Sequence, residues 1–247
     1  MPQLTALALP DGPGVRAALP DLARALSGQR PAVPLAPAAP SPLEGAEVPP
    51  GTALVLSTSG STGTAKAVAL TRDALLASQD ATAQLFAADG TAPDSRGHGF
   101  WLPLLPPTHI AGLQVLLRAL TAGQTPVVLD MRAGFDPAVY ARAVRDLEGP
   151  RRYTSLVPTQ LVKVLDQPAA TAASRELDAI LVGGAATPKP LWYRAIDEGL
   201  PVVATYGMSE TCGGCVYDGH PFDEVAVTIE DGRVALAGTR PLGLAVQ

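Results

Sequence analysis

Short apolar segments alternate with segments of helical periodicity along most of the chain, and this alternation constrains the fold more than any other feature. The predicted strands are residues 52–57, 66–70, 101–105, 125–129, 154–157, 179–182 and 201–205. The predicted helices are residues 15–26, 71–86, 110–122, 137–146, 159–165 and 188–198. Short apolar strands separated by amphipathic helices are typical of parallel sheets with helices on their faces. We therefore predict an α/β fold of mostly parallel sheets covered by helices.

The two ends of the chain depart from this alternation. Residues 224–229 and 233–237 alternate around Glu230-Asp231-Gly232, which predicts a C-terminal β-hairpin. Residues 30–42 are rich in Pro and Ala. Because proline fixes φ and removes a backbone donor, we expect an extended linker there and neither a helix nor a central strand. These patterns divide the chain into residues 1–50, an N-terminal helix with its linker, and a main unit from residue 51 to 247.

Composition excludes several classes of protein. The chain has 247 residues, 47% of them apolar, and a formal net charge of -5. Because the chain has few aromatic residues and no run of Lys or Arg, we do not expect nucleic acid as a partner. No stretch of 18 apolar residues supports a membrane span. A secretory signal has basic residues before its apolar run, and none precedes the first apolar run of this chain. We expect a cytoplasmic protein with reduced thiols.

Cys212 and Cys215 are the only cysteines. They form a CxxC without a second cysteine pair, whereas a closed zinc site needs four ligands and a redox CxxC normally opens a helix of a thioredoxin-like unit. We expect two packed thiols and no metal or redox site there.

A loop rich in glycine and hydroxyl groups lies between the first two strands of the main unit. Residues 57–66 read Ser-Thr-Ser-Gly-Ser-Thr-Gly-Thr-Ala-Lys. Backbone N–H groups of such a loop can surround an anion, and the ammonium group of Lys66 would offset the charge of a polyphosphate. The spacing from Gly60 to Gly63 is too short for a Walker A loop. A flexible surface loop is the alternative that composition alone leaves open.

A second polar segment follows the predicted strand 201–205. Tyr206 offers a ring face to a base, Ser209 a hydroxyl group, and Glu210 a carboxylate that suits Mg²⁺. Ligands of open α/β sheets bind beyond the carboxyl ends of the strands, which is where both polar segments are expected. Taken alone, Tyr-Gly after a strand is more often a simple turn.

Together the two segments resemble the ANL superfamily of adenylate-forming enzymes, whose motifs are (S/T)SG(S/T)TGxPK and YGxTE. Residues 105–113 and 181–186 resemble two further regions of that family. Residues 155–161, 181–186, 205–214 and 216–225 are most similar to the o-succinylbenzoate-CoA ligases of menaquinone biosynthesis. The resemblance runs from about Gly51 to the last residue. It implies the large N-terminal domain of these enzymes for residues 51–247.

The resemblance assigns roles residue by residue. It implies that the β- and γ-phosphates of ATP are enclosed by Ser57, Thr58, Ser59, Gly60, Ser61, Thr62, Gly63 and Lys66. It places the nucleotide and the acyl group against Gly183, Gly184, Ala185, Thr205, Tyr206 and Gly207. Ser209, where the family has Thr, would bond the α-phosphate, and Glu210 would hold Mg²⁺. His109 would border the acyl pocket, although a histidine beside prolines is otherwise more often a cap or a core residue. Ala65 replaces the usual Pro and loosens the loop.

The implied reaction is attack of a carboxylate on the α-phosphorus of ATP, followed by transfer of the acyl group to coenzyme A. The implied partners are a small carboxylic acid, ATP with Mg²⁺, and CoA as co-substrate, with a homodimer left open. The family's (Y/R)TGD motif and small C-terminal domain do not appear in these residues. We therefore expect weak ATP binding and poor thioester formation from this chain. A ligase for another aryl or fatty acid and a non-catalytic nucleotide-binding remnant stay open.

Overall fold

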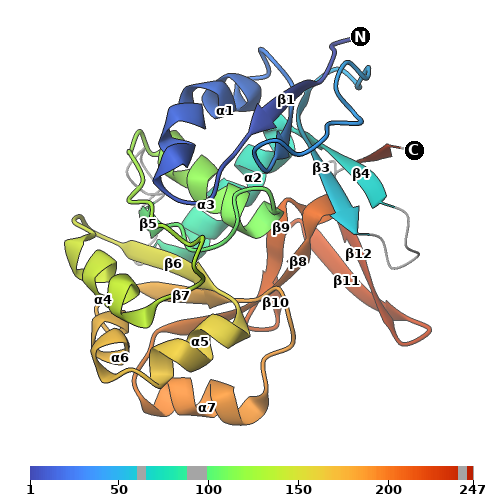
Figure 1. The fold of residues 1–247 in the computed structure, drawn as a ribbon. Coiled ribbons are helices and arrows are strands. Elements are labelled where there is room, and N and C mark those ends of the chain that lie inside the picture. The colour runs from blue at the N-terminus through green and yellow to red at the C-terminus, as the bar shows by residue number, and fades with distance from the viewer. Residues whose placement is uncertain (60–64, 88–98, 239–243, 247) are drawn as a thin grey trace.

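The computed structural model describes residues 1–59, 65–87, 99–238 and 244–246 (Figure 1). Its strands are β1 (Thr5–Ala8), β2 (Ala32–Leu35), β3 (Thr52–Ser59), β4 (Ala65–Thr71), β5 (Phe100–Leu102), β6 (Arg152–Leu156), β7 (Ala179–Val182), β8 (Val202–Met208), β9 (Gly213–Tyr217), β10 (His220–Pro221), β11 (Val225–Glu230), β12 (Arg233–Gly238) and β13 (Leu244–Val246). Its helices are α1 (Leu19–Leu26), α2 (Arg72–Phe86), α3 (Ile110–Thr121), α4 (Pro137–Asp146), α5 (Pro158–Leu165), α6 (Pro168–Ser174) and α7 (Lys189–Asp197), with 3-10 turns η1 (Pro13–Ala18) and η3 (Ser209–Thr211).

The first sheet has the strand order β1-β2-β3-β4-β13. β1, β2 and β3 are parallel, whereas β4 pairs antiparallel with both of its neighbours. An apolar cluster joins this sheet to α1, α2 and α3, and it includes Leu22, Leu54, Leu70 and Leu117. These side chains are buried, so the first sheet and its helices share one core.

The expected linker is wrong for residues 32–35, which form β2 between β1 and β3. β2 pairs with β3 at Ala32↔Leu54, before Pro34, so the missing N–H of Pro34 does not interrupt that pairing. The division of the chain at residue 50 stays a prediction about domains. Strands from both sides of that position lie in one sheet.

The second sheet has the order β10-β9-β8-β7-β6-β5. β5 to β8 are parallel, and β9 and β10 add antiparallel strands at one edge. Helices α4 to α7 pack on this sheet around a second apolar cluster, which includes Leu102, Tyr140, Leu161 and Ile180 (Figure 1). α2 and α3 lie between the two sheets, since α2 contacts β3, β4 and β9, and α3 contacts β5, β6 and β9.

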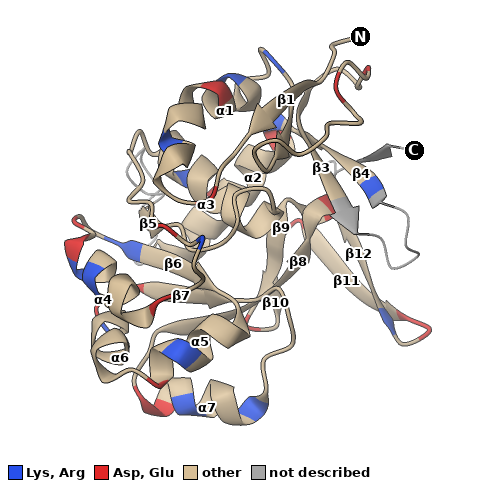
Figure 2. Cartoon of the chain, viewed as in Figure 1, with Lys and Arg blue, Asp and Glu red and all other residues tan. Residues whose placement is uncertain are grey.

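The predicted α/β class with mostly parallel sheets is confirmed, and so is the C-terminal hairpin. β11 and β12 pair from Val225↔Gly238 to Glu230↔Arg233. Asp231 and Gly232 at their turn both have positive φ, at 49° and 74°, as a tight hairpin turn requires. Charged residues lie on α4, α5 and α7 and at the tip of this hairpin (Figure 2). Among the described helices, none combines the length and hydropathy needed to cross a bilayer.

One of the predicted strands is wrong. Residues 125–129 are not a strand: they are irregular, and Pro126 has no N–H for a ladder. Val127 and Leu129 still pack against the second cluster, which explains their apolar character. In α2, Leu75 is buried, whereas Leu85 is 50% exposed. Thr71 is the N-cap of α2, and its side chain accepts a hydrogen bond from the backbone N–H of Ala74 at 3.2 Å.

Candidate functional site

The hydroxyl-rich segment is the end of an antiparallel hairpin. β3 continues through Ser59, and its last residues pair with the start of β4, with Thr58 opposite Lys66. Gly60, Ser61, Thr62 and Gly63 lie outside the described residues. Lys66 is exposed at the start of β4. This pairing places Ser57, Thr58 and Ser59 at the end of β3 and Lys66 at the start of β4.

The second polar segment begins in β8 and ends in the turn η3. Thr205, Tyr206 and Gly207 belong to β8, and Tyr206 is 43% exposed. Ser209 and Glu210 lie in η3 and are half-buried. The Thr211 hydroxyl oxygen accepts from the backbone N–H of Met208 at 2.9 Å and lies 2.6 Å from the backbone oxygen of Gly213, to which it donates. η3 contacts β4, so the two polar segments that are far apart in sequence lie side by side.

The glycine turn after β7 lies directly against Thr205. A Cβ atom on Gly183 would be 2.3 Å from Thr205 Oγ1 and 2.9 Å from its carbonyl oxygen. Gly184 has φ of +78°, a conformation that L side chains rarely adopt. Ala185 is exposed beside them. The 183–185 turn, the end of β8 and η3 therefore line the same edge of the second sheet.

We expect Gly183→Ala to weaken AMP binding about 10-fold, because the added methyl group pushes the 183–185 turn away from Thr205. Titration calorimetry with AMP measures the change. Adding Thr205→Ala should restore part of the affinity, since it removes the nearer of the two colliding atoms. Unchanged AMP affinity in the single variant would show that this turn does not face the nucleotide.

His109 occupies the N-cap position of α3, where its carbonyl oxygen accepts the backbone N–H of Leu113 at 2.8 Å. Its exposed side chain makes no capping hydrogen bond. The first turn of α3 lies beside β9, since a Cβ atom on Gly213 would be 3.8 Å from Ile110 Cγ1. His109 thus begins the helix that borders the β8–β9 connection, and its role at an acyl pocket stays a prediction.

A buried polar cluster between α2, α3 and β9 was missed by the sequence analysis. Its members are Ser78, Gln79, Thr82, Gln114, Arg118, Thr121 and Tyr217. The Arg118 guanidinium donates to Thr82 Oγ1 at 3.0 Å and lies 4.5 Å from the centre of the Trp101 ring. Within the described ranges no acidic side chain pairs with Arg118, and its Nε has no hydrogen-bond partner. The available signal was the spacing of Gln114, Arg118 and Thr121, which places three polar residues on one face of an apolar helix.

Burial lowers the pKa of Arg118, and the neighbouring Tyr217 partly opposes that shift. Tyr217 connects the buried polar cluster to the site. Its hydroxyl oxygen lies 3.2 Å from Thr82 Oγ1, and a Cβ atom on Gly214 would be 2.9 Å from that hydroxyl. A buried positive charge therefore lies behind the glycine pair 213–214.

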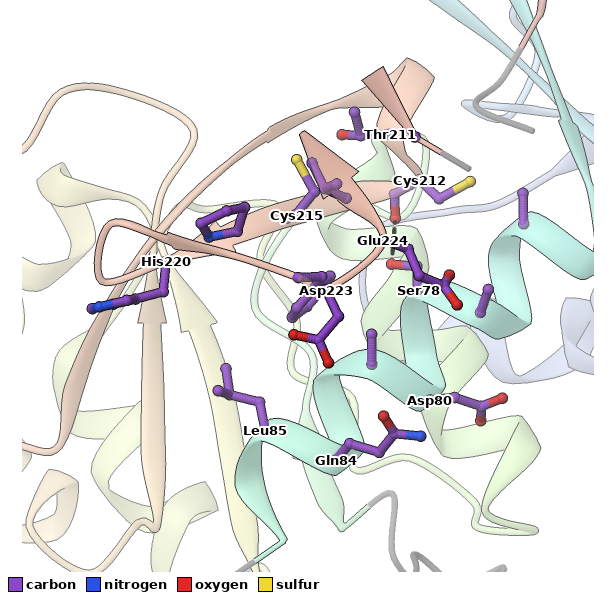
Figure 3. A pocket seen from close by; sticks show the side chains of 18 residues that line it. Ser78, Asp80, Gln84, Leu85, Thr211, Cys212, Cys215, His220, Asp223 and Glu224 are labelled. Carbon is purple, nitrogen blue, oxygen red and sulfur yellow. Dashed lines mark hydrogen bonds between the residues drawn. The ribbon is translucent and has the colours of Figure 1, made fainter. Parts of the chain in front are cut away.

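The two cysteines are buried and unpaired, as expected. Their sulfur atoms point in different directions beside a cavity of about 400 Å³ between α2 and residues 211–225 (Figure 3). Burial raises the pKa of Cys212 to about 12 and also raises that of Cys215. Both thiols therefore stay protonated at neutral pH and are poor nucleophiles.

The donor set at the site fits a cation that is shared with a phosphate. Among residues whose placement is described, no three His, Cys, Asp or Glu side chains gather as a metal cage. Mg²⁺ commonly binds through one or two carboxylates together with substrate phosphates. Glu210, half-buried next to β4, is suited to supply such a carboxylate.

Comparison with known proteins identifies the class. Residues 15–240 match the family described as AMP-binding enzyme, and the chain belongs to this family. The chain is 45% identical over 241 residues to a probable 2-succinylbenzoate--CoA ligase of Mycobacterium tuberculosis. The aligned region covers 95% of this chain and 61% of that protein. The chain thus spans about three fifths of the length of this relative.

Two solved structures show the same fold. One is the o-succinylbenzoate CoA synthetase of Bacillus subtilis in complex with its acyl-adenylate intermediate, with a TM-score of 0.74 and 21% identity over 98% of this chain and 61% of that one. The other is the same synthetase with ATP and magnesium ion, with a TM-score of 0.63 and 26% identity over 82% of this chain and 45% of that one. The predicted membership of the adenylate-forming enzymes is confirmed.

Proposed function

We propose that the protein is an AMP-forming acid-CoA ligase that activates 2-succinylbenzoate in menaquinone biosynthesis. The observation that carries the proposal is the shared location of three segments: the β3–β4 hairpin with Lys66, the 183–185 turn, and η3 with Glu210. The similarity to a 2-succinylbenzoate--CoA ligase over 95% of the chain supports the choice of acid. A cytoplasmic location, CoA as the acyl acceptor and a homodimer belong to the same proposal.

The chemistry needs positioning and charge neutralisation and no protein nucleophile. The substrate carboxylate attacks the α-phosphorus of ATP, and the bond to the β-phosphate breaks with release of pyrophosphate. Lys66 offsets the charge of the departing phosphates, while the Ser209 hydroxyl donates to an α-phosphate oxygen. Glu210 would hold Mg²⁺, which would supply positive charge to the phosphate oxygens. Tyr206, exposed at the end of β8, offers its ring to the adenine.

Arg118 favours an acid with a second carboxylate. After one carboxyl group of 2-succinylbenzoate is activated, the other still carries a negative charge. The buried guanidinium raises the electrostatic potential behind Gly213 and Gly214, because little solvent is present to screen it. A buried guanidinium that pairs with no acidic side chain among the described residues therefore favours a dicarboxylic acid over a neutral or monocarboxylic acid of similar shape.

We expect Arg118→Met to raise the KM for 2-succinylbenzoate about 10- to 100-fold, because a charged interaction of this kind contributes about 1.5–3 kcal/mol. The KM for benzoate, which has no second carboxylate, should change less than about 3-fold. Acid-dependent exchange between ATP and pyrophosphate measures both constants. Equal losses for the two acids would mean that Arg118 only supports the fold.

The same exchange reaction tests the proposed function across a panel of acids. The panel contains 2-succinylbenzoate, benzoate, other aryl acids and fatty acids. The proposal predicts exchange that is fastest with 2-succinylbenzoate. A higher rate with a fatty acid or another aryl acid would assign a different ligase, and no exchange with any acid would favour a nucleotide-binding protein without catalysis.

A further inference from the structure

The turn that carries Ser209 and Glu210 ends in a strained residue. Cys212 follows η3 with φ of 57° and ψ of 30°, the left-handed region that costs a non-glycine residue about 1 kcal/mol or more. A strained residue persists when its surroundings over-determine it. The direction of η3 therefore depends on what holds Cys212.

Two buried side chains hold the carbonyl group of Cys212, and they come from different helices. Gln114 of α3 donates from Nε2 to the Cys212 oxygen at 2.7 Å, and Ser78 of α2 donates from Oγ to the same oxygen at 3.2 Å (Figure 3 shows the second bond). Gln114 is 2% exposed and Ser78 is 9% exposed. Both bonds are shielded from water, so losing either donor leaves a buried acceptor less well satisfied.

Gln114 is itself oriented by its neighbours. Its Oε1 accepts from Gln79 Nε2 at 3.3 Å, and Gln79 Oε1 accepts from the Thr121 hydroxyl at 2.8 Å. The three bonds run in one direction, from Thr121 through Gln79 and Gln114 to the Cys212 carbonyl. Because each amide has a fixed donor end and acceptor end, this order selects the rotamer in which Gln114 presents its N–H to Cys212.

These bonds also connect η3 to the two helices α2 and α3. α2 follows β4, which begins next to Lys66, and α3 begins at Ile110, directly after its N-cap His109. Both helices reach the Cys212 carbonyl, one residue after η3. We propose that Gln114 and Ser78 are positioning residues, which fix the η3 turn relative to β4 so that Ser209 and Glu210 meet the phosphates that Lys66 contacts. The identity of the ligand, ATP, rests on the proposed function. The role of Gln114 and Ser78 in holding the η3 turn does not.

The first test needs no ligand. Hydrogen exchange of the backbone amides of residues 208–213 is measured in the wild-type chain and in Gln114→Met, which keeps the side-chain length and removes the donor. We expect exchange in this turn to become about 10-fold faster in the variant, with little change in α6. Gln79→Met, which leaves Gln114 in place but removes its orienting bond, should act in the same direction more weakly. It serves as the second variant if Gln114→Met does not fold.

The second test measures ATP affinity by calorimetry with Mg²⁺ and with EDTA. Gln114→Met should weaken binding about 10-fold in Mg²⁺ and less than about 2-fold in EDTA, because only the metal-dependent contact depends on Glu210. Thr171→Val is the matched control. Thr171 is buried in α6, outside the hydrogen bonds that hold η3, and donates to the Val164 oxygen at 2.9 Å. Thr171→Val should lower the free energy of unfolding, but it should change neither the hydrogen exchange of residues 208–213 nor the ATP affinity.

The possible results distinguish the positioning proposal from the proposed function. Wild-type exchange at residues 208–213 in both glutamine variants would overturn the positioning proposal, as would a Gln114→Met variant with the wild-type dependence on Mg²⁺. A wild-type chain that does not bind ATP in Mg²⁺ would overturn the proposed function. In that case the hydrogen-exchange measurement still decides whether Gln114 holds the turn.

Discussion

Replacing Glu210 by Gln should lower the Mg²⁺-dependent exchange between ATP and pyrophosphate by about 100-fold or more. The substitution keeps the size of the side chain and removes the negative charge that the cation requires. The hydrogen bonds of the turn come from Thr211 and the Cys212 carbonyl, so η3 keeps its shape. The free energy of unfolding should change by less than about 0.5 kcal/mol.

The exchange rate is followed against Mg²⁺ concentration, and unfolding is followed by circular dichroism. Glu148→Gln is the matched control, because Glu148 is exposed beyond the end of α4 and outside the site. It should leave the rate and the Mg²⁺ dependence unchanged. A Glu210→Gln variant with the wild-type dependence on Mg²⁺ would remove Glu210 from the proposed site.

The second large effect is expected on stability, from Gly207→Ala. A Cβ atom on Gly207 would lie 1.9 Å from the Gly213 carbonyl oxygen and 2.7 Å from Gly214 Cα. These are backbone atoms of the neighbouring strand and cannot rotate away, so β8 and β9 must separate locally. We expect the free energy of unfolding to fall by about 3 kcal/mol, as measured by denaturant titration.

Gly214→Ala provides the comparison for this prediction. Gly214 pairs with Gly207 across β8 and β9, but its added methyl group would meet the Tyr217 hydroxyl at 2.9 Å, the end of a side chain. A side chain can shift more easily than a backbone, so the loss should be smaller. A Gly207→Ala variant as stable as the wild type would contradict the close approach of Gly207 to the β9 backbone. The resemblance assigns Gly207 to the nucleotide, and the sheet gives a separate reason for a glycine there.

Elements with strong local patterns could be predicted from the sequence. β7 is a short run of four buried apolar residues, and the hairpin carries Asp-Gly at its turn. β9 was missed because it contains two glycines, and its place is determined by pairing with β8 and by Tyr217 packing against Phe86 and Phe222. The irregular segment 125–129 has the apolar composition of a strand. Pro126, which lacks a backbone N–H, and the lack of a partner strand among the described residues distinguish it from a strand.

Some residues of the candidate site could likewise be predicted from the sequence, and others could not. Ser57, Lys66, Gly183, Tyr206 and Glu210 lie in motifs whose order along the chain indicates a common ligand, and the structure brings their segments together. The buried polar cluster could not be predicted, because its hydrogen bonds join residues of α2, α3 and β9 that are distant in sequence. Its partners become visible only once the helices are packed between the two sheets.

The central claim is that the substrate carboxylate attacks the α-phosphorus of ATP in this site. The most direct test uses 2-succinylbenzoate labelled with oxygen-18 in its carboxyl groups, together with ATP, Mg²⁺ and CoA, and mass spectrometry of the products. The claim predicts AMP carrying one labelled oxygen, because the carboxylate oxygen stays on phosphorus when the acyl group leaves. Label in inorganic phosphate, or AMP without label, would contradict it.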